Sequence, residues 1–207
     1  MIAAISLMRR LDAVDLTTFR RHWLNVHGPL VCAFAGLRRY VQCHVIDTPA
    51  TNAAARSMRI DGFPILFFDN DTERSRAHGS PEMAACNVDS RSFIGAVSRA
   101  ITRPIEVVPI AASAGPISAM VLCPAGDDVA STEARLRALP GMRGLTRYDV
   151  LEQGPAPAST VPHLPVSVAG VFQVWFGSLV ELEAAMAGFD RPVFAVEAHW
   201  LTPTPAA

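Results

Sequence analysis

The fold is decided by a short segment that the chain carries twice. The first copy reads Gly36-Leu37-Arg38-Arg39-Tyr40, and the second reads Gly144-Leu145-Thr146-Arg147-Tyr148. A second pair follows, because Asp61-Gly62 and Ala169-Gly170 each precede a stretch that ends in two aromatic residues. Both pairs have the same offset, 144 − 36 = 108 and 170 − 62 = 108. One offset shared by two separate segments indicates an internal repeat.

The hydrophobic pattern predicts the same order of elements in both halves. In the first half we expect strands at residues 2–8, 37–46, 62–68 and 105–110, helices at 15–34, and a broken helical region at 71–100. In the second half we expect strands at 117–122, 145–151, 168–176 and 193–201, with helices at 129–139 and 179–186. Loops are expected at 47–60 and 154–165. Each half therefore reads βαββαβ, the order of a ferredoxin-like unit.

This order predicts an α+β protein of two tandem ferredoxin-like units with antiparallel sheets. We place the first unit at residues 1–111 and the second at 112–207. The second copy is degenerate, because its first helix is shorter and lacks histidine and aromatic residues.

Composition narrows the classes of function. The 207 residues are 50% hydrophobic and 18% charged, with a formal net charge of −1, which is typical of a compact globular protein. Because no basic cluster or membrane-length apolar run is present, we expect neither a nucleic-acid nor a membrane partner. The four cysteines form no Cys-x-x-Cys pair, which predicts reduced, buried thiols and a cytoplasmic location.

The densest group of reactive side chains lies in the first predicted helix, around His22, Trp23 and His27. An imidazole titrates near neutral pH, so His27, next to Gly28-Pro29, is the candidate acid or base. The alternative is a histidine that only caps a helix C-terminus. His22 lies five residues earlier, about 140° around a regular α-helix, so the two rings should not share a face unless the helix bends. This spacing disfavours a metal site and leaves His22 a structural role, with Trp23 packing beside His27 or in the core.

The first half resembles a known family. The pattern Phe19-x-x-His22-Trp23-x-x-x-His27-Gly28-Pro29-Leu30 and the strand beginning at Gly36 are similar to the signature of the EthD domain. Asp61-Gly62, Ser80-Pro81-Glu82-Met83, and Asp89 with Arg91 and Phe93 fit the same family. The resemblance implies a dimeric α/β-barrel, here closed within one chain, with a small-molecule pocket on a sheet face. It also implies a range of chemistries: ether degradation, isomerisation, dehydration, cofactor-free oxygenation and haem chemistry.

The second strand supplies further candidates. Tyr40, Gln42 and His44 alternate on one face, and we expect that face to line the barrel interior while Val41 and Cys43 meet the helices. Adding the offset of 108 brings Tyr148 and Glu152 to the same pocket, and Phe67 and Trp175 to its apolar end. The alternative is that these polar groups pair with one another in a buried network.

From these residues we expect a protein that binds an apolar or aromatic small molecule without a cofactor or metal. The catalytic candidates are His27, Tyr40 and His44, with His27 moving a proton and Tyr40 or His44 polarising an oxygen. The substrate-binding candidates are His22, Trp23, Gln42, Phe67, Tyr148, Glu152 and Trp175. Whether the protein is an enzyme stays open: an oxidoreductase, isomerase or lyase, a haem-handling barrel with His27, His44 or His199 as ligand, and a non-catalytic accessory protein all fit. We expect a monomeric pseudo-dimer or a homodimer.

Overall fold

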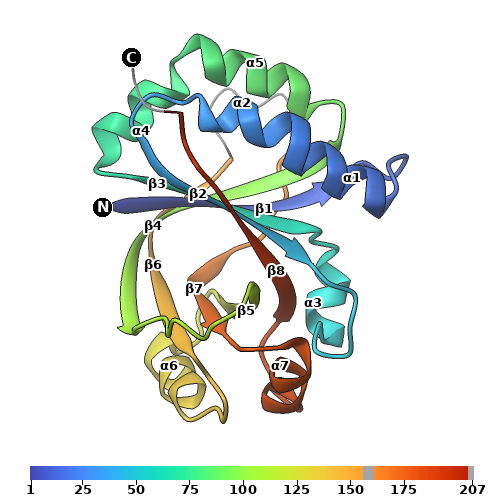
Figure 1. Cartoon of the computed structure of the whole chain (residues 1–207), viewed down its shortest axis with the longest axis vertical. Helices are drawn as coiled ribbons and strands as arrows, with labels where there is room; N and C mark the ends of the chain where they lie inside the picture. The colour runs from blue at the N-terminus through green and yellow to red at the C-terminus, as the bar shows by residue number, and fades with distance from the viewer. Residues whose placement is uncertain (156–160, 205–207) are drawn as a thin grey trace.

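The computed structural model describes residues 1–155 and 161–204. Within these residues, eight antiparallel strands close into a barrel in the order β1-β3-β2-β8-β5-β7-β6-β4 (Figure 1). The strands are β1 (Ile2–Arg10), β2 (Leu37–Val45), β3 (Gly62–Phe68), β4 (Ile94–Val108), β5 (Ile117–Pro124), β6 (Gly144–Gly154), β7 (Val168–Trp175) and β8 (Val193–Leu201). The predicted α+β barrel, formed within one chain, is therefore confirmed.

Each half contributes the strand order of a ferredoxin-like unit. The first four strands are arranged as β4-β1-β3-β2 and the last four as β8-β5-β7-β6, which is the same permutation. The two sheets join through β2 with β8 and through β4 with β6. We propose that the units divide in the connection between β4 and β5, where the expected boundary at residues 111 and 112 falls.

The helices cover the outer faces of the barrel. They are α1 (Leu16–His22), a π-helix η1 (Trp23–His27), α2 (Gly28–Cys32), α3 (Ala53–Met58), α4 (Asp71–His78), α5 (Pro81–Ser90), α6 (Val129–Arg137) and α7 (Leu179–Met186). Figure 1 shows α1, α2, α4 and α5 on one side of the barrel and α6 and α7 on the other. Asp15 caps α1 by accepting a hydrogen bond from the Thr18 amide.

The core has an inner and an outer part. The barrel interior is filled by buried side chains from every strand, including Ile5, Val41, Met120, Val171 and Phe194. Outside the barrel, separate apolar clusters pack beneath the helices of each half. All four cysteines are free and buried.

Two predicted elements were wrong. Residues 91–100 were expected to be helical, but Ile94–Val108 forms the long strand β4, because it pairs with β1 on one side and β6 on the other. Sheet pairing outweighs local propensity here. The expected loop at 47–60 contains the helix α3. Asn52 caps the N-terminus of this helix, because its side chain accepts a hydrogen bond from the Ala55 amide. Residues 156–160 of the loop expected at 154–165 lie outside the described residues.

A β-bulge in β2 decides which way its side chains point. The register against β3 shifts between Leu37 and Arg39, and a one-residue shift moves all following side chains to the opposite face. Tyr40 therefore packs with Leu37 on the helix-covered face, whereas Val41 and Cys43 enter the barrel. The expectation that Tyr40, Gln42 and His44 face the barrel interior was wrong for this reason.

The equivalent strand of the second half has no such shift against β7. Leu145 packs outside the barrel and Tyr148 inside it. Tyr40 and Tyr148, which the sequence offset aligns, thus point to opposite sides of the sheet.

The two glycines related by the repeat allow a test of the packing on the first half. A Cβ at Gly62 would overlap the ring of Trp23, a fully buried side chain, whereas a Cβ at Gly170 would meet Val129 at 3.4 Å. We expect Gly62→Ala to lower the free energy of unfolding by about 1–3 kcal/mol, because overpacking forces the indole to move. Thermal unfolding followed by circular dichroism measures this, with Gly170→Ala as the matched control. Equal melting temperatures for the two variants would contradict the packing described.

Candidate functional site

The helix that carries the two histidines changes its winding between them. After α1 the chain continues as the π-helix η1, in which the Gly28 N–H bonds to the Trp23 carbonyl, five residues back. In this winding, residues five apart lie on one face of the helix, and such turns are frequent at functional sites. His22 and His27 are five apart, so the expectation that their rings do not share a face was wrong.

Both histidines bind one carboxylate. Asp89, on α5, lies 2.8 Å from Nε2 of His22 through Oδ1 and 2.8 Å from Nδ1 of His27 through Oδ2. The hydrogen bond from His27 lowers the pKa of Asp89, burial opposes this, and the bond from His22 adds to the lowering. An ionised carboxylate only accepts hydrogen bonds, so His27 carries its hydrogen on Nδ1 and leaves Nε2 as the acceptor of the neutral ring.

Asp89 acts as the partner that sequence reasoning missed. From the sequence, Asp89 was named only as one residue of the family pattern. It lies 62 residues from His27 in the chain. No local spacing signals a contact over that separation. The contact arises because α5 packs against the π-helix.

Tyr40, Gln42 and His44 form the buried network that was the alternative to a pocket wall. Tyr40 Oη accepts hydrogen bonds from Trp23 Nε1 at 3.0 Å and from Gln42 Nε2 at 3.1 Å. Gln42 Nε2 also donates to the Trp23 carbonyl, and its Oε1 pairs with His44 Nε2 at 3.0 Å. Because both acceptor positions of the Tyr40 oxygen are occupied, its own hydrogen is left to be donated elsewhere.

The titration of these groups limits their roles. Burial raises the pKa of Tyr40, so its hydroxyl stays protonated and can act as a donor. Burial, followed by the charges of His199 and Arg20, lowers the pKa of His44 to about 3. The His44 ring also stacks on Trp23, with 4.4 Å between ring centroids. His44 is therefore a neutral packing group at ordinary pH.

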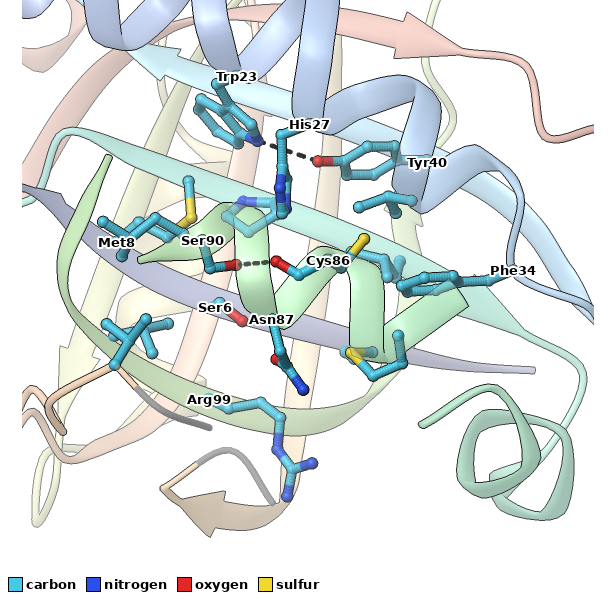
Figure 2. A pocket seen from close by; sticks show the side chains of 18 of the residues that line it. Ser6, Met8, Trp23, His27, Phe34, Tyr40, Cys86, Asn87, Ser90 and Arg99 are labelled. Atoms are coloured by element: carbon cyan, nitrogen blue, oxygen red, sulfur yellow. Dashed lines mark hydrogen bonds between the residues drawn. The ribbon is translucent and has the colours of Figure 1, made fainter. Parts of the chain in front are cut away.

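A cavity lies between the outer face of the first sheet and the helices η1, α2 and α5. Its walls are mainly apolar, formed by side chains such as Val31, Phe34, Leu66, Met83, Ile94 and Val97. Figure 2 shows Trp23, His27 and Tyr40 together at one end, Arg99 toward the other, and Ser6 and Asn87 between them. The polar groups are thus few among mainly apolar walls, a composition typical of ligand sites.

The remaining candidates do not join this cavity. Phe67, Tyr148 and Trp175 line a separate hollow at the barrel, which also includes Arg39 and Trp200. Glu152 has a side chain that is 63% exposed and forms an ion pair with Arg99. The expected single pocket of Tyr40, His44, Tyr148 and Glu152 was wrong, because the bulge in β2 places the first two on the other side of the sheet from Tyr148.

Metal ions and membranes call for other arrangements of residues. Within residues 1–155 and 161–204, no group of three or more histidine, cysteine, aspartate or glutamate side chains is placed to hold a metal ion. No helix in this same part of the chain is long and apolar enough to cross a membrane.

The bridging carboxylate makes the stability of this region depend on pH. The pKa of Asp89 is lowered from its ordinary 3.8 in the folded protein, so its stabilisation is present above that value and lost as the pH falls through the folded pKa. We expect Asp89→Asn to lower the free energy of unfolding by about 1–3 kcal/mol near neutral pH. Below pH ~4 the difference from the wild type should shrink.

Melting temperatures of both proteins between pH 3 and 7 measure this. Asp69→Asn is the control, because the ion pair of Asp69 with Arg38 is exposed and should contribute little. A difference between wild type and Asp89→Asn that stays constant over this pH range would contradict the assignment.

Solved structures with the same architecture are similar over the whole chain. An anthrone oxidase-like protein matches 100% of this chain and 96% of its own, with a TM-score of 0.60 and 10% identity. A protein from Lactobacillus acidophilus NCFM, proposed to be a monooxygenase, matches 98% of this chain and 96% of its own, with a TM-score of 0.53 and 11% identity. At these identities the likeness shows the fold alone.

Two further comparisons concern part of the chain. Among solved structures, an EthD family protein from Bacillus halodurans C-125 is 21% identical over 50% of this chain and 97% of its own, and its TM-score of 0.42 carries no argument about this chain. Comparison with curated proteins gives no significant match. The EthD domain model matches residues 11–96, a range that contains His22, His27, Tyr40 and Asp89. The resemblance seen in the sequence is thereby confirmed, and residues 11–96 of this chain are an EthD domain.

Proposed function

We propose that the cavity beneath α5 binds an apolar, aromatic small molecule and that His27 exchanges a proton with it. The observation that carries this proposal is the pairing of His27 Nδ1 with Asp89 at 2.8 Å while the same ring lines an apolar cavity. A carboxylate on Nδ1 fixes the ring orientation and tautomer and stabilises the imidazolium that forms when Nε2 accepts a proton. The pair is thus suited to general base catalysis.

Tyr40 supplies the second element of the mechanism. Tyr40 lines the same cavity, and because its hydroxyl oxygen accepts two hydrogen bonds, its own hydrogen is available to a further acceptor. When a C–H bond next to a ligand carbonyl breaks, the proton goes to His27 Nε2 and the electron pair moves to the carbonyl oxygen. A donated hydrogen bond from Tyr40 stabilises the resulting enolate. The returning proton completes the exchange.

This step is common to several reaction classes. Isomerisation, dehydration and cofactor-free oxidation of an aromatic ketone or lactone all begin with the loss of such a proton. The proposal therefore concerns the proton transfer and the ligand class, and it leaves the final product open. His44 has no place in it, because its ring is neutral and packed against Trp23.

Binding without catalysis is the second candidate. The mainly apolar walls of the cavity under α5 favour binding whether or not a proton moves. The two candidates differ in one respect only, the dependence of proton exchange on His27.

Exchange of a carbon-bound proton for deuterium tests the proposal. The probe is 2-tetralone, an aromatic ketone with an acidic benzylic C–H, and proton NMR in D₂O follows the loss of its benzylic signal. We expect the wild-type protein to accelerate exchange and His27→Gln to reduce that acceleration roughly 10²–10⁴-fold, as for the loss of a general base. Circular dichroism establishes that the variant is folded.

His199→Gln is the matched control, since His199 is half-buried outside this cavity, and it should exchange at the wild-type rate. Acceleration that persists in His27→Gln would overturn the proton-transfer role. Binding of the ketone without any acceleration of proton exchange would support the non-catalytic accessory function instead.

A further inference from the structure

The end of the cavity remote from His27 contains a buried arginine that is only partly paired. Arg99, on β4, is 4% exposed, and its Nη2 donates to Glu152 Oε1 at 3.1 Å. Its Nε and Nη1 are buried, and neither has a hydrogen-bond partner among the described residues. Buried donors of a charged group are almost always paired, so two unpaired ones in a cavity wall indicate a missing acceptor.

The one partner that Arg99 has does not neutralise it well. The Glu152 side chain is 63% exposed and so remains largely hydrated, whereas the Arg99 side chain is 5% exposed. Burial lowers the pKa of Arg99, as does the charge of Arg74, while Glu152 and Asp71 oppose this. A guanidinium nevertheless stays protonated in proteins, so a full positive charge is present at this end.

A histidine at the same end has an unused ring nitrogen. His78, on α4, lines the cavity, and its Nδ1 is buried without a hydrogen-bond partner in the described part of the chain. Burial, then the charges of Arg74 and Arg99, lowers the pKa of His78 to about 4, so the ring is neutral at ordinary pH. A neutral imidazole can donate one hydrogen bond to an anion without adding a second buried charge.

We propose that Arg99 binds a carboxylate, so that the ligand of this cavity is an aromatic carboxylic acid whose opposite end lies against His27 and Tyr40. A carboxylate accepts hydrogen bonds only, and charge-assisted bonds to a guanidinium are among the strongest that a site can offer. The apolar walls between the two ends match an aromatic body and disfavour a heavily hydrated phosphate (Figure 2). The placement of the reacting end rests on the proposed function, whereas the carboxylate site does not.

A pair of probes that differ in charge alone tests the site. Isothermal titration calorimetry at pH 7 compares 2-naphthoic acid with 2-naphthamide, which has the same body without the charge. We expect the wild type to bind the acid roughly 10-fold or more tightly than the amide. Arg99→Met replaces the buried charge by an apolar side chain of similar length, and should weaken binding of the acid to the level of the amide while leaving the amide unchanged.

Two further variants make the result decisive. Arg103→Met removes an exposed arginine of the same strand and should leave both affinities unchanged. Arg99→Lys retains the positive charge and should keep part of the preference for the acid. If Arg99→Met binds neither probe, the result with Arg99→Lys still tests whether the charge at this position causes the preference. Equal affinities for the two probes in the wild type, or no binding of either, would overturn the carboxylate site.

These outcomes are separate from those of the exchange experiment. Exchange of 2-tetralone that depends on His27 would stand even if the acid and the amide bound equally. A preference for the acid that depends on Arg99 would likewise stand if no exchange occurred.

Discussion

The carboxylate of Asp89, held between two imidazole rings, is the interaction on which the rest of the site depends. It fastens α5 to the π-helix, so that one helix covers the cavity and the other places His27 in its wall. The two rings reach the same carboxylate only because the backbone is wound with five-residue hydrogen bonds at Trp23–His27. Local winding, helix packing and the orientation of the His27 ring are therefore parts of a single arrangement.

The two halves share an architecture but not this arrangement. Both have the same strand permutation, and both cover their sheet with helices over apolar clusters. The barrel interior is filled with side chains, which leaves the helix-covered face of the first sheet as the place for the cavity of the EthD domain. The second half completes the barrel for the first by pairing β8 with β2 and β6 with β4. We propose that it serves mainly as this structural partner.

The repeat, the strand order and the family could be predicted from the sequence, because these depend on the hydrophobic pattern and on motifs spread along the chain. Sequence reasoning failed where one residue changes the geometry. The bulge after Leu37 moved Tyr40, Gln42 and His44 to the helix side, and the π-winding brought His22 beside His27. Asp89 and Arg99 could not be recognised as site residues, because their partners lie far away in the chain and neither sits in a local motif with a meaning of its own.

Fusion of the two sheets into one chain has a consequence for how the protein can change over generations. In a barrel built from two identical chains, any substitution is copied into both copies and alters both junctions at once. Here each junction is encoded separately, and the corresponding strands have already diverged, with β4 running for 15 residues and β8 for nine. Selection can therefore act on the half that holds most of the cavity while the other half drifts, limited by the need to close the ring of strands and by its residues at the cavity, such as Val161 in the wall and Glu152 paired with Arg99.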